Sequence, residues 1–87
     1  MVWREINGRL CTEMKCKDFE EALLFLNEIA AIAEKLNHHP DIKIHSYRFI
    51  SIEVYTHDTN SITEKDHELK KEIHVCWLKI KGLDPIY

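Results

Sequence analysis

The sequence has little from which to build a disulfide framework or a thiolate metal site. Its three cysteines, Cys11, Cys16 and Cys76, are odd in number, and no two of them form a CxxC pair. Small secreted domains usually carry an even set of paired cysteines, and structural zinc sites usually draw on closely spaced thiolates. We therefore expect reduced thiols and a cytoplasmic protein.

Long apolar runs and a basic face are also missing. No stretch approaches the roughly 20 apolar residues that are needed to span a bilayer, and residues 1–5 lack the basic region and apolar run of a signal peptide. The formal net charge of -3 argues against nonspecific binding to nucleic acid. Neither a membrane nor a nucleic acid is expected as a partner.

Glycine and proline are scarce, with two of each in 87 residues. No linker, low-complexity tract or internal repeat divides the chain, so we expect a single domain over residues 1–87. A domain of this size buries only about 60–65% of its unfolded surface and is marginally stable alone. Association into a homo-oligomer, a dimer or a tetramer, would bury more.

Four strands are predicted from alternating side chains and turn signals. The clearest signal is Asn7-Gly8, because both central residues of a type I′ turn need positive φ. In the last predicted strand, Ile50, Ile52 and Val54 alternate with other residues, as a sheet with one face on the core requires. The predicted strands are approximately residues 2–6, 9–15, 42–46 and 47–56.

The longer predicted helix begins after Asp18, an N-cap that forms a capping-box-like pair with Glu21. It ends before Pro40, because proline disfavours helical geometry in the residue that precedes it. Phe25 and Ile32 form a second apolar line, which is either part of a wide core face or a self-association surface. The main predicted core stripe consists of Phe19, Ala22, Leu23, Leu26, Ile29, Ala30, Ala33 and Leu36.

The second predicted helix starts at the capping box Thr63-Glu64-Lys65-Asp66 and ends at Gly82 and Pro85. Asp66 is therefore first a structural cap and only second a possible site residue. The order β-β-α-β-β-α with short connections predicts an α+β fold. In this fold a four-stranded antiparallel sheet forms one layer, and both helices pack on one face of it.

Three of the six histidines are placed where they could do chemistry. His38 and His39 follow the long helix, whose terminal carbonyls favour the imidazolium form, and Glu34 lies one turn earlier, where its carboxylate could orient His38. His57 follows the last strand. Imidazoles titrate near neutral pH and suit general acid–base catalysis.

Other interpretations of these residues remain open. Each histidine alone could be a helix-end or turn residue with no chemical role. Glu34, His38, His39 and His57 could instead hold a metal ion, although two adjacent rings at a helix end rarely aim at one ion.

The spacing of these residues resembles the signature of the pterin-4a-carbinolamine dehydratases. That signature has an acidic residue, three residues, His-His-Pro, an aromatic residue, nine residues, a histidine and then an aspartate. The matching positions are Glu34, His38-His39-Pro40, Tyr47, His57 and Asp66, and the match covers approximately residues 3–71. Asn60-Ser61 departs from the family, which usually has a glycine pair there.

The resemblance implies four antiparallel strands backed by helices, commonly in a homotetramer. It also implies a hydro-lyase of tetrahydrobiopterin recycling, which dehydrates 4a-hydroxytetrahydropterin to quinonoid dihydropterin without a metal or redox cofactor. On this interpretation His38 and His57 are the acid–base residues, and His39 is chiefly a substrate contact. The residues that would bind or orient the substrate are Glu34, Asp58 and Thr59.

The family also offers an alternative to this turnover. Relatives in animals act as a dimerisation cofactor for a homeodomain transcription factor, which implies a protein-interaction role for a helix surface. A pterin-binding role with another pterin, such as the molybdenum-cofactor type, is the other form of this alternative.

Overall fold

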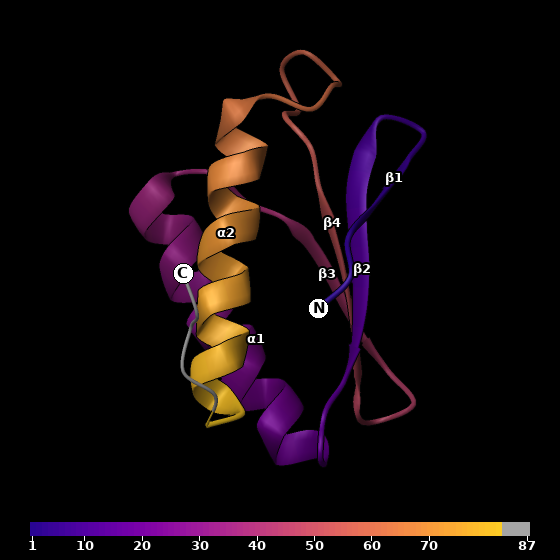
Figure 1. The fold of residues 1–87 in the computed structure, drawn as a ribbon, viewed down its shortest axis with the longest axis vertical. Helices are drawn as coiled ribbons and strands as arrows, with labels where there is room; N and C mark the ends of the chain where they lie inside the picture. Colours follow the sequence, from indigo (N-terminus) through magenta and orange to yellow (C-terminus); the bar gives the residue numbers. More distant parts are fainter. Residues whose placement is uncertain (83–87) are drawn as a thin grey trace.

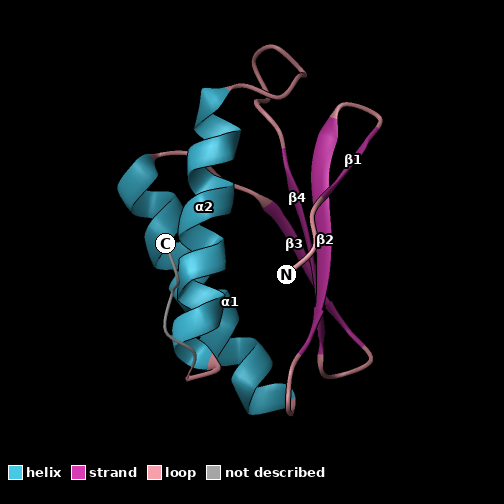
Figure 2. Cartoon of the chain, viewed as in Figure 1, coloured by secondary structure: helices cyan, strands magenta, loops and turns pink. Residues whose placement is uncertain are grey.

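The computed structural model describes residues 1–82, which form one sheet and two helices (Figure 1). Both helices lie on the same side of the sheet (Figure 2), so the predicted two-layer α+β fold is confirmed. Pro85, expected to help end the second helix, lies outside the described residues. The elements in chain order are β1 (Arg4–Ile6), β2 (Arg9–Lys15), α1 (Phe19–Leu36), β3 (Asp41–His45), β4 (Phe49–Val54) and α2 (Glu64–Ile80).

The sheet has the order β1-β2-β4-β3, and its neighbouring strands are antiparallel. The two hairpins therefore join through β2 and β4, which pair from Leu10 opposite Val54 to Lys15 opposite Phe49. Even-numbered side chains of β2 and β4 face the helices, and those of Ile50, Ile52 and Val54 are fully or almost fully buried. Odd-numbered side chains of the two strands lie on the outer face of the sheet.

Helix α1 packs on the core through Ala22, Phe25, Ile29 and Ala33. The core alternative is therefore correct for Phe25, which is 0% exposed and lies 4.9 Å from Trp77 of α2, measured between ring centroids. The predicted stripe was wrong for three residues: Phe19 is 49% exposed, Leu23 is 38% exposed, and Ala30 is also exposed. Helix α2 packs against the side of α1 that carries Phe25, so Phe25 belongs to the core.

Neither of the two described helices is both long enough and apolar enough to span a bilayer. This holds for residues 1–82, which contain α1 and α2.

The two hairpin turns differ in how well their residues suit them. Asn7 and Gly8 have φ values of 51° and 76°, as predicted, whereas Ser46 and Tyr47 have φ values of 48° and 54°. The predicted strands, residues 42–46 and 47–56, left no room for this turn, and neither serine nor tyrosine favours positive φ. Tyr47 therefore sits in a strained backbone conformation.

Replacing Tyr47 with glycine should stabilise the fold by about 0.5–1 kcal/mol, because glycine removes the left-handed strain but adds freedom to the unfolded chain. Urea unfolding measures this. Gly8→Ala is the reverse control: its added Cβ would meet nothing within 4 Å, so φ alone should destabilise that variant by a similar amount. A loss of stability in Tyr47→Gly would mean that the tyrosine ring over Arg48 outweighs the strain.

Candidate active site

The end of α1, the end of β4 and the start of α2 meet at one end of the molecule (Figure 1). Helix α1 ends because Asn37 adopts the left-handed conformation, with φ of 50°. The N–H of His38 then donates to the carbonyl of Ala33, and the N–H of Asn37 donates to that of Glu34. This Schellman arrangement turns the chain directly after the helix. It leaves the side chain of His38 12% exposed and that of His39 55% exposed.

Asp66 lies under this end of the molecule and is 0% exposed. Its Oδ1 lies 2.5 Å from Nε2 of His38, and its Oδ2 accepts hydrogen bonds at 2.8 Å from the hydroxyl of Thr56 and from the N–H of Thr63. The predicted capping box of α2 is present. The same carboxylate thus ties α1, β4 and α2 together.

The environment of Asp66 keeps its carboxylate ionised. Burial alone would raise its pKa, but the hydrogen bonds from His38, Thr63 and Thr56 outweigh burial, and the pKa is lowered. An ionised carboxylate only accepts hydrogen bonds, so Nε2 of His38 carries a proton. Nδ1 is then the nitrogen of His38 that is left to exchange a proton with another molecule.

The predicted pairing of Glu34 with His38 is wrong. Oε2 of Glu34 instead lies 2.5 Å from Nε2 of His39. The i, i+4 rule requires both residues to be helical, and Asn37 breaks the helix before His38. Glu34 and His39 are both more than half exposed, so their interaction contributes little stability.

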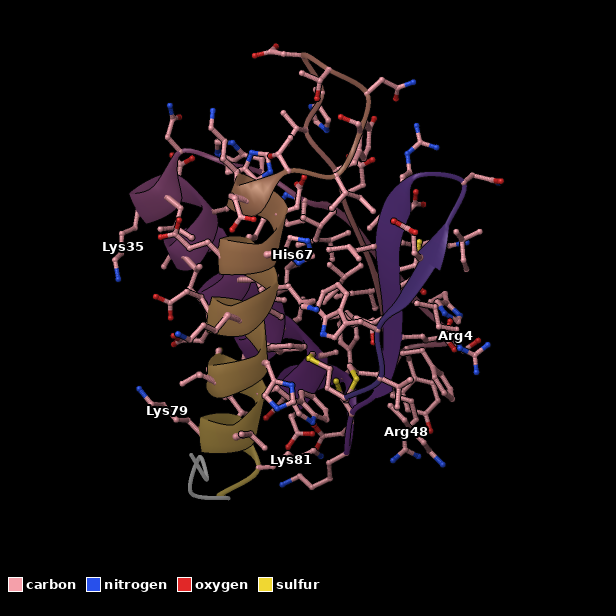
Figure 3. All side chains as sticks on the ribbon, turned by 45° about the horizontal axis from the view of Figure 1, so that its top comes forward. Arg4, Lys35, Arg48, His67, Lys79 and Lys81 are labelled. Atoms are coloured by element: carbon pink, nitrogen blue, oxygen red, sulfur yellow. The ribbon has the colours of Figure 1, made fainter. Side chains whose placement is uncertain are left out.

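A cavity of about 250 Å³ brings the three predicted histidines together at this end of the molecule. A neighbouring cavity of about 430 Å³ shares Thr56, Asp58 and Lys65 with the first. It adds Thr59, Thr63 and Glu64. Figure 3 turns this end toward the viewer and shows polar side chains gathered around it. The first cavity is lined by Asn37, His38, His39, Thr56, His57, Asp58 and Lys65.

Three outcomes for single residues follow from these cavities. Glu34 lines neither of them, although sequence reasoning placed it in the site. Lys65 lines both, and sequence reasoning missed it, since its only signal was its place beside Asp66 in the capping box. His67, labelled on α2 in Figure 3, is exposed and lines neither cavity.

The side chains of the alternative metal set do not converge on one point. Glu34 is engaged with His39, whereas His38 is engaged with Asp66. Across residues 1–82, no three or more histidine, cysteine, aspartate or glutamate side chains are grouped so that they could hold a metal ion.

Proteins of related sequence carry one family description. Relatives from Sulfolobus acidocaldarius and Trichormus variabilis are 38% and 39% identical over 83% and 82% of this chain, and the matches cover 78% and 75% of those proteins. Both are provisionally named pterin-4-alpha-carbinolamine dehydratases.

Solved structures share the fold. A Brucella melitensis protein described as a transcriptional coactivator/pterin dehydratase superposes with a TM-score of 0.79 at 29% identity, over 85% of this chain and 80% of that one. A pterin dehydratase-like RuBisCO assembly factor of the alpha-carboxysome has a TM-score of 0.69 at 14% identity, over 86% of each chain, and shows the fold alone.

The family's own sequence model, described as pterin 4 alpha carbinolamine dehydratase, matches residues 1–75. This range includes every element up to the greater part of α2, and both cavities lie within it. The resemblance found in the sequence is confirmed, and the chain belongs to the pterin-4-alpha-carbinolamine dehydratase family.

Proposed function

We propose that this chain dehydrates a 4a-hydroxytetrahydropterin to the quinonoid dihydropterin, as a lyase of tetrahydrobiopterin recycling. The observation that carries the proposal is the buried pair of Asp66 and His38, which holds an oriented imidazole in the lining of one cavity with His39 and His57. Membership of the family supports it. We place the protein in the cytoplasm, where its three free thiols would stay reduced.

The reaction breaks the bond between C4a and its hydroxyl oxygen and forms a double bond from C4a to the adjacent ring nitrogen. An acid gives a proton to the departing hydroxyl, and a base takes the proton of that nitrogen. The two transfers release one water and change no oxidation state, so the scheme calls for no redox cofactor. Positioned imidazoles can perform either transfer near neutral pH.

In this scheme His38 and His57 carry out the two proton transfers. Asp66 fixes the ring of His38 and keeps its Nε2 protonated, which leaves Nδ1 for the exchange. His39 is more exposed and is already paired with Glu34, so we assign it chiefly to substrate contact. Asp58 and Thr59 supply polar contacts where the two cavities join.

The direct test is stopped-flow measurement with a synthetic 4a-hydroxytetrahydropterin. Micromolar protein should accelerate the dehydration well above its spontaneous rate. Binding of the pterin without acceleration would refute the proposal and favour the alternative of a pterin-binding module without turnover.

We also propose that copies of the chain associate through the outer side of the two helices. A groove of about 370 Å³ there is lined by Leu24 and Ile32 of α1 and by Val75 and Ile80 of α2. Leu24 is 50% exposed. The acidic and basic side chains of the groove could pair with their opposites across a two-fold axis; these are Glu28, Glu72 and Lys79.

Leu24→Glu should therefore reduce the sedimenting mass relative to wild type at micromolar concentration, because it places charge in the apolar part of the contact. Leu23→Glu is the matched control: Leu23 is 38% exposed but does not line the groove. A wild-type monomer, or equal masses for wild type and Leu24→Glu, would contradict this interface. Phe25 cannot serve as the probe, since a charge there would disrupt the core.

A further inference from the structure

His57 is held differently from the other two histidines of the cavity. His38 and His39 each pair with a carboxylate, that of Asp66 or Glu34. Within residues 1–82, the ring of His57 makes no hydrogen bond or ion pair to another side chain, and the residue is exposed. An exposed imidazole without a partner samples several rotamers, so another contact is needed to orient it.

That contact is the ring of Tyr55, whose centroid lies 4.4 Å from the centroid of the His57 ring, with the planes tilted by 52°. Tyr55 follows β4 directly and comes two residues before His57. Tyr55 continues the outward-facing, odd-numbered side of β4, whereas His57 lies in the turn that follows and lines the cavity. Tyr55 is half-buried and so is the more constrained of the two.

Tyr55 is fixed in turn by Arg9 of the neighbouring strand β2. The guanidinium carbon of Arg9 lies 4.2 Å from the centroid of the Tyr55 ring, in cation–π geometry. Nε of Arg9 is buried and lies 3.5 Å from Oε1 of Glu53, the next outward-facing residue of β4. Arg9, Tyr55 and His57 thus form a continuous column, which runs from the outer face of the sheet to the cavity.

We infer that Tyr55 and Arg9 are positioning residues that hold the imidazole of His57 for the reaction. The inference rests on the proposed function. Packing through the ring, unlike pairing with a carboxylate, occupies neither ring nitrogen. His57 can therefore be oriented while Nδ1 and Nε2 both remain free to exchange protons with substrate.

Kinetics of Tyr55 variants test the positioning role. Tyr55→Ala should lower kcat for 4a-hydroxypterin dehydration by about two- to tenfold, the factor that corresponds to the free energy of one aromatic pair. KM should change less than twofold, because Tyr55 lines neither cavity. Tyr55→Phe keeps the ring and should restore wild-type kcat. Arg9→Met should cause a smaller loss than Tyr55→Ala.

Phe49→Ala is the matched control. Phe49 is also an outward-facing ring of β4 and stacks on a histidine, His45, with centroids 5.5 Å apart, but this pair lies away from the cavity. Its removal should leave kcat unchanged. Equal losses in Phe49→Ala and Tyr55→Ala would overturn the inference, since the effect would then be a general weakening of the sheet. An unchanged kcat in Arg9→Met would overturn the part assigned to Arg9.

A readout without turnover separates this inference from the proposed function. In the NMR spectrum of the substrate-free protein, the ring protons of His57 should carry a ring-current shift that is lost in Tyr55→Ala and kept in Tyr55→Phe. Identical His57 shifts in wild type and Tyr55→Ala would overturn the column, whatever the protein catalyses. Wild-type turnover in Tyr55→Ala would overturn the positioning role and leave the dehydratase proposal standing.

Discussion

His38→Gln should lower kcat for dehydration by about 10²–10⁴-fold, the contribution of one positioned acid–base group. Glutamine is the sharper substitution because its amide can still donate a hydrogen bond to Asp66 but cannot transfer a proton. His38→Ala would also leave the buried carboxylate without its histidine partner, so it would mix a stability loss with the catalytic loss. The rate should therefore be measured on His38→Gln, with circular dichroism to verify folding.

His57→Ala should show a loss of the same order, because it removes the second acid–base group. Within residues 1–82 no side chain hydrogen-bonds to the His57 ring, so the substitution leaves no described group unpaired. The double variant tests whether the two rings act on one reaction: residues that share a chemical step lose less together than the product of their single losses. His67→Ala is the control, because His67 is exposed on α2 and lines neither cavity. Full activity in either His38→Gln or His57→Ala would refute the acid–base assignment.

Local signals in the sequence predicted most of the framework around this site. Asn7-Gly8 and the capping residues Asp18 and Thr63 each act through the backbone of their own turn or helix end, and all three appear in the structure as expected. Such effects depend on a few neighbouring residues and not on the fold. The order of the elements then followed from their spacing, which is why the fold class could be predicted.

Contacts between distant segments could not be predicted in the same way. Asp66 was assigned to its cap three residues away, but its second oxygen faces His38, 28 residues earlier in the chain. Glu34 was paired with His38 by a helical rule that stops applying at Asn37. The contact between Tyr55 and Arg9 depends on the pairing of β2 with β4, which no local pattern specifies.

Asp66→Ala should destabilise the protein by about 3 kcal/mol, more than the roughly 0.5–2 kcal/mol expected for a helix cap alone. It removes the acceptor from His38, Thr56 and the N–H of Thr63 at once. Leaving a buried donor without its acceptor costs about 1–3 kcal/mol. We expect the lower end of that range for each of the three donors, because His38 is 12% exposed and retains some contact with water. Urea unfolding at pH 7 measures the difference.

Asp66→Asn separates the charge from the cap. The amide oxygen can still accept from Thr63 and Thr56, so this variant should lose less stability than Asp66→Ala. Its amide nitrogen, however, would donate to Nε2 of His38 and favour the tautomer protonated on Nδ1. We therefore expect kcat to fall at least about tenfold in a folded protein. Wild-type kcat in Asp66→Asn would show that Asp66 is a structural residue only.

Because Asp66 is ionised in the folded protein, the free energy of unfolding of the wild type should depend on pH. The pKa of Asp66 is lowered from its ordinary value of 3.8, so its ionised form stabilises the fold at every pH above that value. This contribution is lost as the pH falls below about 4 and through the lowered pKa, where the folded protein must also take up the proton. The stability difference between wild type and Asp66→Asn should therefore be larger at pH 5 than at pH 2, and it should shrink as the pH falls below about 4. An equally large difference at pH 2 and pH 7 would mean that the carboxylate charge does not act on His38, and that packing alone joins the end of α1 to the start of α2.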